Sequence, residues 1–259
     1  MSTAPTTDHV TPPRAPSSIE VHLLGLVNYD RCLELQQALI DDAISRADRR
    51  AVVLLCEHPA AISVGRSGSW SQLNGSVQSA HPAGGRPRPG VPLHWSNRGG
   101  RCQLHLPGQI NLYGIVPIEA IGWSVGEYLG RLERALTDVC GDVRVEARRQ
   151  RPGRGLWARA GQVAAVGVAV KHGVSYYGAQ LNVEPDLGAF ARHLRVDAQQ
   201  RYSSLAAETR RPMSMSRVRS FLLARLAEAF DCQRLGVSTG HPLLRSIPTA
   251  PTGEVASVV

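Results

Sequence analysis

The chain has few of the residues that mark disulfide-bonded, zinc-binding or membrane-spanning proteins. Its five cysteines are widely spaced and form no C-x-x-C pair, so they predict reduced, mostly buried thiols. They are Cys32, Cys56, Cys102, Cys140 and Cys232. No apolar run approaches the roughly 18 residues of a membrane span, and the N-terminus lacks the apolar segment of a signal peptide. These absences favour a cytoplasmic protein without membrane contact, metal or other cofactor.

Lysine and aromatic residues are also scarce. Lys171 is the only lysine among 29 basic residues, and the formal net charge is +8. Aromatic residues make up 5% of the chain, which leaves few rings to stack on bases, so no nucleic-acid partner is expected. The arginines are dispersed, which favours a solvated surface, with a basic face for an acidic partner or a phosphate as the alternative.

The apolar residues that are present predict one large domain of mixed structure. They make up 43% of 259 residues, enough for a sizeable core. Periodicity predicts helices over 29–46, 123–140 and from Ser214 or Ser216 to 230. Strands are predicted over 20–27, 51–56, 62–65, 110–118, 162–170 and 174–183, the last two joined as a hairpin at 171–173. Strands and helices do not alternate strictly along the sequence, which predicts an α+β fold with a mixed β-sheet and packed helices.

Composition also divides the chain. Residues 1–18 are rich in Pro, Thr and Ser and predict a disordered N-terminal tail, and 19–235 form the domain. Within it, 67–92 are rich in Ser, Gly, Pro and Arg without apolar periodicity, which predicts a mobile insertion without helix or strand. Residues 236–259 predict a loose C-terminal tail.

The stretch R-G-G-R-C-Q-L-H-L-P-G-Q at 98–109 has the composition of a ligand cradle. Its paired glycines allow the backbone to approach a ligand closely, and its Pro-Gly pair ends a short strand. In a strand, one face would carry Arg101, Gln103 and His105, and the other Cys102 and Leu104. His105 is therefore the polar candidate, and Cys102 is predicted to lie in the core.

Six segments in order resemble the octanoyltransferase family of lipoate biosynthesis. They are L-L-C-E-H-P-A-A-I-S-V-G-R (54–66), the cradle (98–109), G-L-W (155–157), Q-V-A-A-V-G (162–167), Y-Y-G-A-Q-L-N-V (176–183) and Y-S-S-L (202–205). The resemblance covers about 20–232. It implies a catalytic domain like those of biotin/lipoate A/B protein ligases.

The resemblance also implies an activity and partners. Octanoyltransferases move an octanoyl group from octanoyl-acyl carrier protein to a lysine of the lipoyl domains of 2-oxoacid dehydrogenases or glycine cleavage proteins. Such partners tend to be acidic, which would give an arginine-rich surface a use. The segments implied to form the acyl pocket supply Arg98, Gly99, Gly100, Arg101, Cys102, Gln103, Leu104, His105, Ala165, Val166, Gly167, Gly178, Ala179 and Gln180.

The catalytic pair of the family is replaced in this chain. The family forms a thioester on a cysteine in a P-C-G motif, beside a lysine in K-I-A-A-I-G, and the lysine charge favours the thiolate. Here Val196 stands at the cysteine position and Gln162 at the lysine position, while Tyr177 replaces a family histidine. Valine has no lone pair and glutamine no charge, so the usual thioester catalysis is not expected.

Four residues are candidates to supply the missing chemistry. Lys171 lies at the far end of the strand from Gln162, and Cys102 is assigned to the core. Asp197 adjoins the nucleophile position, but an exposed acid accepts a proton poorly at neutral pH. His105 is the most plausible base for direct transfer of octanoyl to lysine, driven by proximity alone.

Three functions remain open from the sequence. The first is an octanoyltransferase that uses unusual residues. The second is a catalytically silent homologue that binds an acyl chain, a carrier protein or a lipoyl domain. The third is an ATP-dependent ligase, suggested by R-P-G-R-G-L-W at 151–157, which resembles a phosphate loop but lies just before the Q-V-A-A-V-G strand instead of far upstream.

Overall fold

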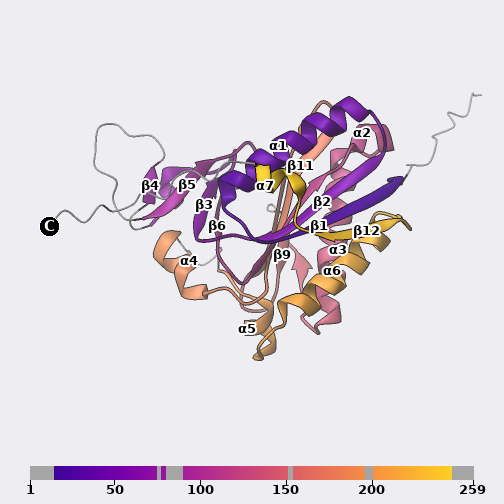
Figure 1. Ribbon diagram of the computed structural model, residues 1–259. Helices are drawn as coiled ribbons and strands as arrows, with labels where there is room; N and C mark the ends of the chain where they lie inside the picture. The colour runs from indigo at the N-terminus through magenta and orange to yellow at the C-terminus, as the bar shows by residue number, and fades with distance from the viewer. Residues whose placement is uncertain (1–14, 75–76, 80–89, 151–153, 196–200, 247–259) are drawn as a thin grey trace, which may run out of the picture.

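Two β-sheets organise the computed structural model, which describes residues 15–74, 77–79, 90–150, 154–195 and 201–246 (Figure 1). The larger sheet contains β1 (Ser18–Leu26), β2 (Arg50–Glu57), β7 (Gln109–Ile115), β8 (Arg148–Arg149), β9 (Gly155–Trp157), β10 (Gln162–Lys171), β11 (Val174–Asn182) and β12 (Leu235–Thr239). The smaller contains β3 (Ala61–Val64), β4 (Val77–Ser79), β5 (Val91–Trp95) and β6 (Cys102–His105). Their orders are β12-β1-β2-β7-β11-β10-β9-β8 and β4-β5-β3-β6.

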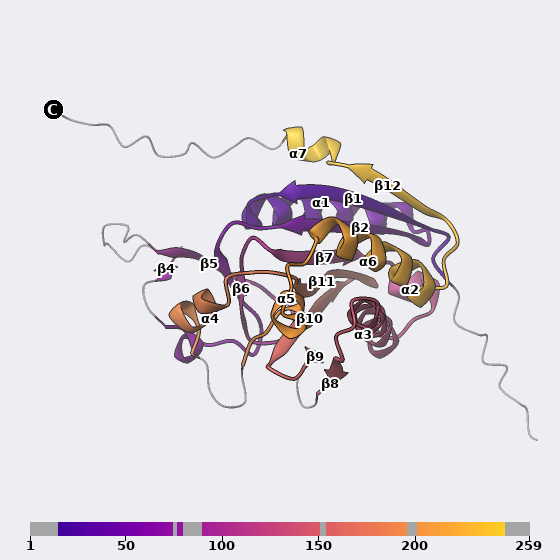
Figure 2. The same cartoon turned by 90° about the horizontal axis from the view of Figure 1, so that it is seen from below.

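Helices cover both faces of the larger sheet (Figure 2). The helices of the described residues are α1 (Tyr29–Arg46), α2 (Ile118–Ile121), α3 (Val125–Asp142), α4 (Leu187–His193), α5 (Leu205–Thr209), α6 (Met215–Ala229) and α7 (Pro242–Ser246), with a 3-10 turn, η1, at Trp70–Gln72. One face packs against α1, and the other against α3 and α6. This arrangement confirms the predicted α+β fold with a mixed sheet. None of the helices within the described ranges is both long and apolar enough to span a membrane.

Strand β2 explains why its sequence is a continuous apolar run. Alternate side chains of a strand point to opposite faces of its sheet, and both faces are covered here. Val53 and Leu55 join the core beneath α3 and α6, whereas Val52 and Leu54 join the core beneath α1. A strand buried on both sides cannot show the apolar and polar alternation of a half-exposed strand.

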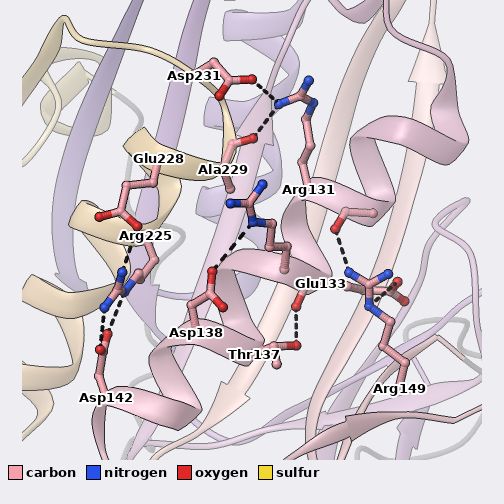
Figure 3. Close-up of polar contacts among 12 residues, drawn as sticks. Arg131, Glu133, Thr137, Asp138, Asp142, Arg149, Arg225, Glu228, Ala229 and Asp231 are labelled. Carbon is pink, nitrogen blue, oxygen red and sulfur yellow. Dashed lines mark hydrogen bonds and ion pairs between the residues drawn. The ribbon is translucent and has the colours of Figure 1, made fainter.

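A capped end and ion pairs stabilise the helices α3 and α6, and Figure 3 shows the ion pairs. Ser124 begins α3 with a capping box, in which its hydroxyl accepts from the Glu127 amide and the Glu127 carboxylate accepts from the Ser124 amide. Arg225 of α6 donates to both carboxylate oxygens of Asp142, at 2.6 and 2.9 Å. The two helices thus form a braced layer behind β10.

Several predicted elements are confirmed and two predictions are wrong. Helix α1 spans the predicted residues, and β10 and β11 pair as the predicted antiparallel hairpin. The insertion at 67–92 contains β4, which pairs with β5, although 75–76 and 80–89 lie outside the described residues. The segment after 235 is not a loose tail up to 246, because β12 pairs with β1 and α7 contacts α1. These short or exposed elements have too little apolar pattern to be recognised.

Candidate functional site

The glycine loop before β6 lies directly on β10. The Gly99 amide donates to the Val168 carbonyl at 3.0 Å. A Cβ atom at Gly167 would lie 2.4 Å from the Gly99 carbonyl oxygen, closer than two such atoms can approach. Glycine at 167 is therefore what allows the loop and the strand to touch, and Gly100 adopts a φ of 95° in the loop itself.

Arg98 anchors this loop from inside. Its side chain is 3% exposed and donates to the Ser63 carbonyl and hydroxyl, both at 2.8 Å, and to the Gly99 carbonyl at 3.0 Å. No carboxylate of a described residue forms an ion pair with it. Burial lowers the pKa of Arg98 from its usual value. The guanidinium thus serves as a structural strut between the loop and β3.

His105 belongs to the same buried network and does not face the large cavity. Its Nε2 lies 2.8 Å from the Ser63 hydroxyl and its Nδ1 lies 3.0 Å from Oδ1 of Asn111. The side-chain nitrogen of Asn111 donates to the Cys56 carbonyl, so its Oδ1 accepts from Nδ1, and Nε2 accepts from the Ser63 hydroxyl. The side-chain nitrogen of Gln180 also lies 3.0 Å from Nδ1. Burial, together with the charges of His58 and Arg98, holds the pKa of His105 well below its usual value. The ring is therefore neutral and fully hydrogen-bonded.

This burial predicts that stability falls in mild acid. An unfolded histidine takes up a proton near pH 6.5, whereas folded His105 does not. The contribution of His105 to the free energy of unfolding is therefore complete above that pH and is lost as the pH falls below it. We expect the free energy of unfolding to fall by about 1.4 kcal/mol per pH unit for this group below about pH 6.5. Urea unfolding at several pH values should show that the free energy of unfolding depends less on pH in His105→Gln than in the wild type. The control His172→Asn, in an exposed turn, should leave the slope unchanged, and an unchanged slope in His105→Gln would contradict the expectation.

A cavity of about 1010 Å³ opens beside the glycine loop and β10. Ten of the predicted pocket residues line it: Gly99, Gly100, Arg101, Cys102, Gln103, Leu104, Ala165, Val166, Gly167 and Gln180. The other four, Arg98, His105, Gly178 and Ala179, lie behind this wall around a void of about 10 Å³. The structure thus brings the three predicted segments together, and their binding of substrate stays a prediction.

The sequence analysis missed the basic character of the cavity. Five of its lining residues are arginines, and none of the described lining residues is acidic: Arg66, Arg101, Arg154, Arg159 and Arg201. Buried Glu133 of α3 lies behind them, with its carboxylate 3.4 Å from Arg149 and 3.6 Å from Arg154 (Figure 3 shows the first of these pairs). The arginines come from separate stretches of the chain, so no single motif marks them.

Apolar residues line the same cavity. They include Val125 and Leu129 of α3, together with Leu104, Val166 and Phe190. The ring of Phe190 stacks on Tyr202 with centroids 4.3 Å apart. A hydrocarbon chain and an anionic group can therefore be accommodated in one cavity.

Comparison with known proteins identifies the family. Residues 28–227 match the lipoyl protein ligase A/B catalytic domain. The chain belongs to that family. It is 34% identical over 171 residues to an octanoyltransferase from Syntrophobacter fumaroxidans, covering 64% of this chain and 70% of that protein. It is 32% identical over 219 residues to an octanoyltransferase from Mycobacterium bovis, covering 83% and 88%.

Solved structures of lipoate protein ligases share the fold of this lipoyl protein ligase A/B catalytic domain. Lipoate-protein ligase A bound with ATP superposes with a TM-score of 0.63 at 15% identity, covering 88% of this chain and 92% of that one. A bi-partite lipoate protein ligase from Thermoplasma acidophilum superposes with a TM-score of 0.62 at 14% identity, covering 88% and 89%. The expected superfamily fold is confirmed.

One position of the family's catalytic pair can be placed. Gln162 begins β10 and lines the cavity, and its backbone N–H donates to the Arg201 carbonyl at 2.8 Å. Its side chain donates to the Ala164 carbonyl at 3.2 Å. Val196 and Asp197 lie outside the described residues. Gln162, the residue predicted to stand at the family's lysine position, is thus on the cavity wall and has a neutral side chain.

The other candidates lie where they cannot readily replace the pair. Lys171 is at the far end of β10 from Gln162, with its Nζ 3.0 Å from Asp41. Cys102 also touches the cavity, but it is 5% exposed and belongs to the core of the smaller sheet, as predicted. Burial raises the pKa of its thiol, which keeps it protonated. Tyr177 lines only the small void behind the wall.

Proposed function

We propose that this protein binds the octanoyl thioester of an acyl carrier protein in its cavity and brings it to a lysine of a lipoyl domain without forming an acyl-enzyme. The observation that carries the proposal is one cavity lined by both apolar residues and arginines, in a chain similar to proteins named octanoyltransferase. Lipoyl domains of 2-oxoacid dehydrogenases or glycine cleavage proteins are the proposed acceptors.

The two kinds of lining residue suit the two ends of such a thioester. Val125, Leu129 and Phe190 favour the eight-carbon chain, because burial removes its surface from water. The thioester arm of an acyl carrier protein contains a phosphate, and arginine binds phosphate oxygens with paired N–H groups. Arg66 and Arg159 are free of ion pairs with the described acidic residues and are the proposed contacts.

Direct transfer needs no protein nucleophile. The neutral lysine amine attacks the thioester carbonyl, the carbon–sulfur bond breaks, and the amine proton passes to the departing thiolate. Holding the two reactants together supplies the acceleration. His105 contributes to this step only by shaping the wall, because both its nitrogens are already hydrogen-bonded.

Gln162 favours a second candidate, a catalytically silent member that binds the acylated carrier. The neutral amide at the family's lysine position cannot favour a thiolate, and the thiol of Cys102 is buried. In this case the cavity would retain binding and lose transfer. A protein of this kind would sequester octanoyl-acyl carrier protein or present it to another protein.

A transfer assay distinguishes the two candidates. Purified protein, octanoyl-acyl carrier protein and lipoyl domain are mixed, and octanoyl-lysine is followed by intact mass spectrometry. Transfer above the uncatalysed rate supports direct transfer, whereas binding of the loaded carrier without transfer supports the silent candidate. No binding of the loaded carrier would overturn both.

A matched pair of variants tests whether the cavity is responsible. Ala165→Phe places a ring in the cavity and is expected to reduce binding of the loaded carrier by at least tenfold. Val170→Phe, on the exposed end of the same strand, should leave binding unchanged. Equal binding by the two variants would show that the acyl chain lies elsewhere.

A further inference from the structure

Two cysteines and a histidine converge in the core beneath α1, away from the cavity. Cys32 lies on α1, Cys56 near the end of β2, and His58 just after that strand. Their sulfur and nitrogen atoms all lie within 4.8 Å of one another, and the three side chains are at most 4% exposed. The sequence alone hides this cluster, because Cys32 is remote in the chain and no C-x-x-C pair is formed.

His58 is oriented as metal-binding histidines commonly are. Its Nδ1 lies 2.6 Å from the Val27 carbonyl, an acceptor, so this nitrogen carries the proton. Nε2 therefore carries the lone pair, and this nitrogen lies 3.5 Å from Cys56 Sγ and 2.7 Å from the Tyr113 hydroxyl, from which it accepts. A backbone carbonyl that fixes the far nitrogen is the usual supporting contact of a histidine ligand.

Cys32 also has a supporting contact. The Oε1 of Gln36 accepts from the Tyr177 amide at 3.1 Å, which fixes the orientation of the side-chain amide. The NH₂ group of Gln36 then faces Cys32, with its nitrogen 3.9 Å from Sγ. An N–H donor held against a sulfur stabilises a thiolate more than a thiol.

The spacing fits a tetrahedral zinc ion. Zinc binds sulfur at about 2.3 Å and nitrogen at about 2.0 Å, so a sulfur and a nitrogen of one tetrahedron lie about 3.5 Å apart. The separation between Cys56 Sγ and His58 Nε2 is 3.5 Å. The hydrogen bond from the Tyr113 hydroxyl to Nε2, now 2.7 Å long, has to open for both groups to bind one ion.

We propose that Cys32, Cys56 and His58 bind one Zn²⁺, with the Tyr113 hydroxyl as the fourth donor. Binding displaces the two thiol protons, and the two thiolates balance the two charges of the ion. The occupied site is electrically neutral, so it leaves no net charge buried in a core where water cannot hydrate it. This proposal departs from the sequence-based expectation that the protein binds no metal.

The site would stabilise the fold instead of taking part in transfer. It ties α1 to β2, and the ring of His58 lies edge-on to His105, with centroids 5.4 Å apart. A ligand that binds only the folded chain adds to its stability. The three donors are buried, so zinc has to be present while the chain folds.

The test is the zinc content of the full chain expressed in zinc-supplemented medium and purified with a thiol reductant. We expect one zinc per chain in the wild type and none in Cys32→Ala or Cys56→Ala. Cys140→Ala removes another buried free cysteine and should retain the zinc. Gln36→Leu keeps all the ligands and should weaken zinc affinity by about 10- to 100-fold.

X-ray absorption of the zinc-loaded wild type tests the site without a variant that has to fold. The expected zinc environment has two sulfur atoms at about 2.3 Å and nitrogen or oxygen at about 2.0 Å. A wild type without zinc, an environment without sulfur, or unchanged zinc in both cysteine variants overturns the proposal. A disulfide between Cys32 and Cys56 in the purified chain also overturns it.

Discussion

Replacing Val196 with cysteine and Gln162 with lysine is expected to give a chain that carries a covalent octanoyl group. The cysteine supplies the thiolate, and the lysine charge lowers the thiol pKa. One thioester replaces another, so the reaction is nearly neutral in free energy. Gln162 already lines the cavity, so a lysine there extends from the cavity wall. Intact mass after incubation with octanoyl-acyl carrier protein should show one added octanoyl group, and none on the unaltered chain.

Single variants and a chemical test complete this experiment. Val196→Cys alone should be acylated more slowly, because no cation favours its thiolate, and Gln162→Lys alone should form no thioester. Neutral hydroxylamine should remove the group from the double variant, as it does from a thioester. A double variant that binds the loaded carrier but forms no adduct would contradict the assignment of these two positions.

Gly167→Ala is expected to destabilise the protein by about 2 kcal/mol and to reduce acyl binding by at least tenfold. The added methyl group meets the Gly99 carbonyl at 2.4 Å, so the loop has to withdraw from β10. That movement breaks the hydrogen bond from Gly99 to Val168 and displaces one wall of the cavity. Urea unfolding and carrier binding measure the two effects.

The same substitution at Gly130 is the matched control. Gly130 lies inside α3, and no atom lies within 4 Å of a Cβ built there. Alanine is more favourable than glycine in a helix by about 1 kcal/mol, so Gly130→Ala should stabilise the protein. Equal effects of the two substitutions would mean that the close approach at Gly167 is not what requires glycine.

The elements with strong apolar periodicity could be predicted from the sequence. α1 was predicted to the residue because its apolar positions repeat at helical spacing, and the hairpin of β10 and β11 because a glycine turn separates two apolar runs. β4 has only three residues, and β12 is largely exposed. Both are too short to show a clear apolar periodicity, and each pairs with another strand, β4 with β5 and β12 with β1.

The candidate site was predicted in its segments but not in its roles. The cradle, the strand with Gln162 and the strand with Gln180 do meet at one cavity. The sequence predicts Arg98 and His105 to be pocket residues, yet both are buried behind the pocket, because their side chains are turned toward Ser63. Which face of a short strand looks into a cavity depends on the second sheet, and its position is not contained in the local pattern.

The pairing of β12 with β1 constrains the order in which the chain can fold. Ile19 pairs in parallel with Ala51 of β2 on one side and with Leu235 of β12 on the other. During synthesis, β1 keeps one edge unpaired until residues 235–239 have been made. An unpaired edge can capture another chain in the same state. The time between synthesis of the two ends is therefore the period in which this protein is most prone to aggregate.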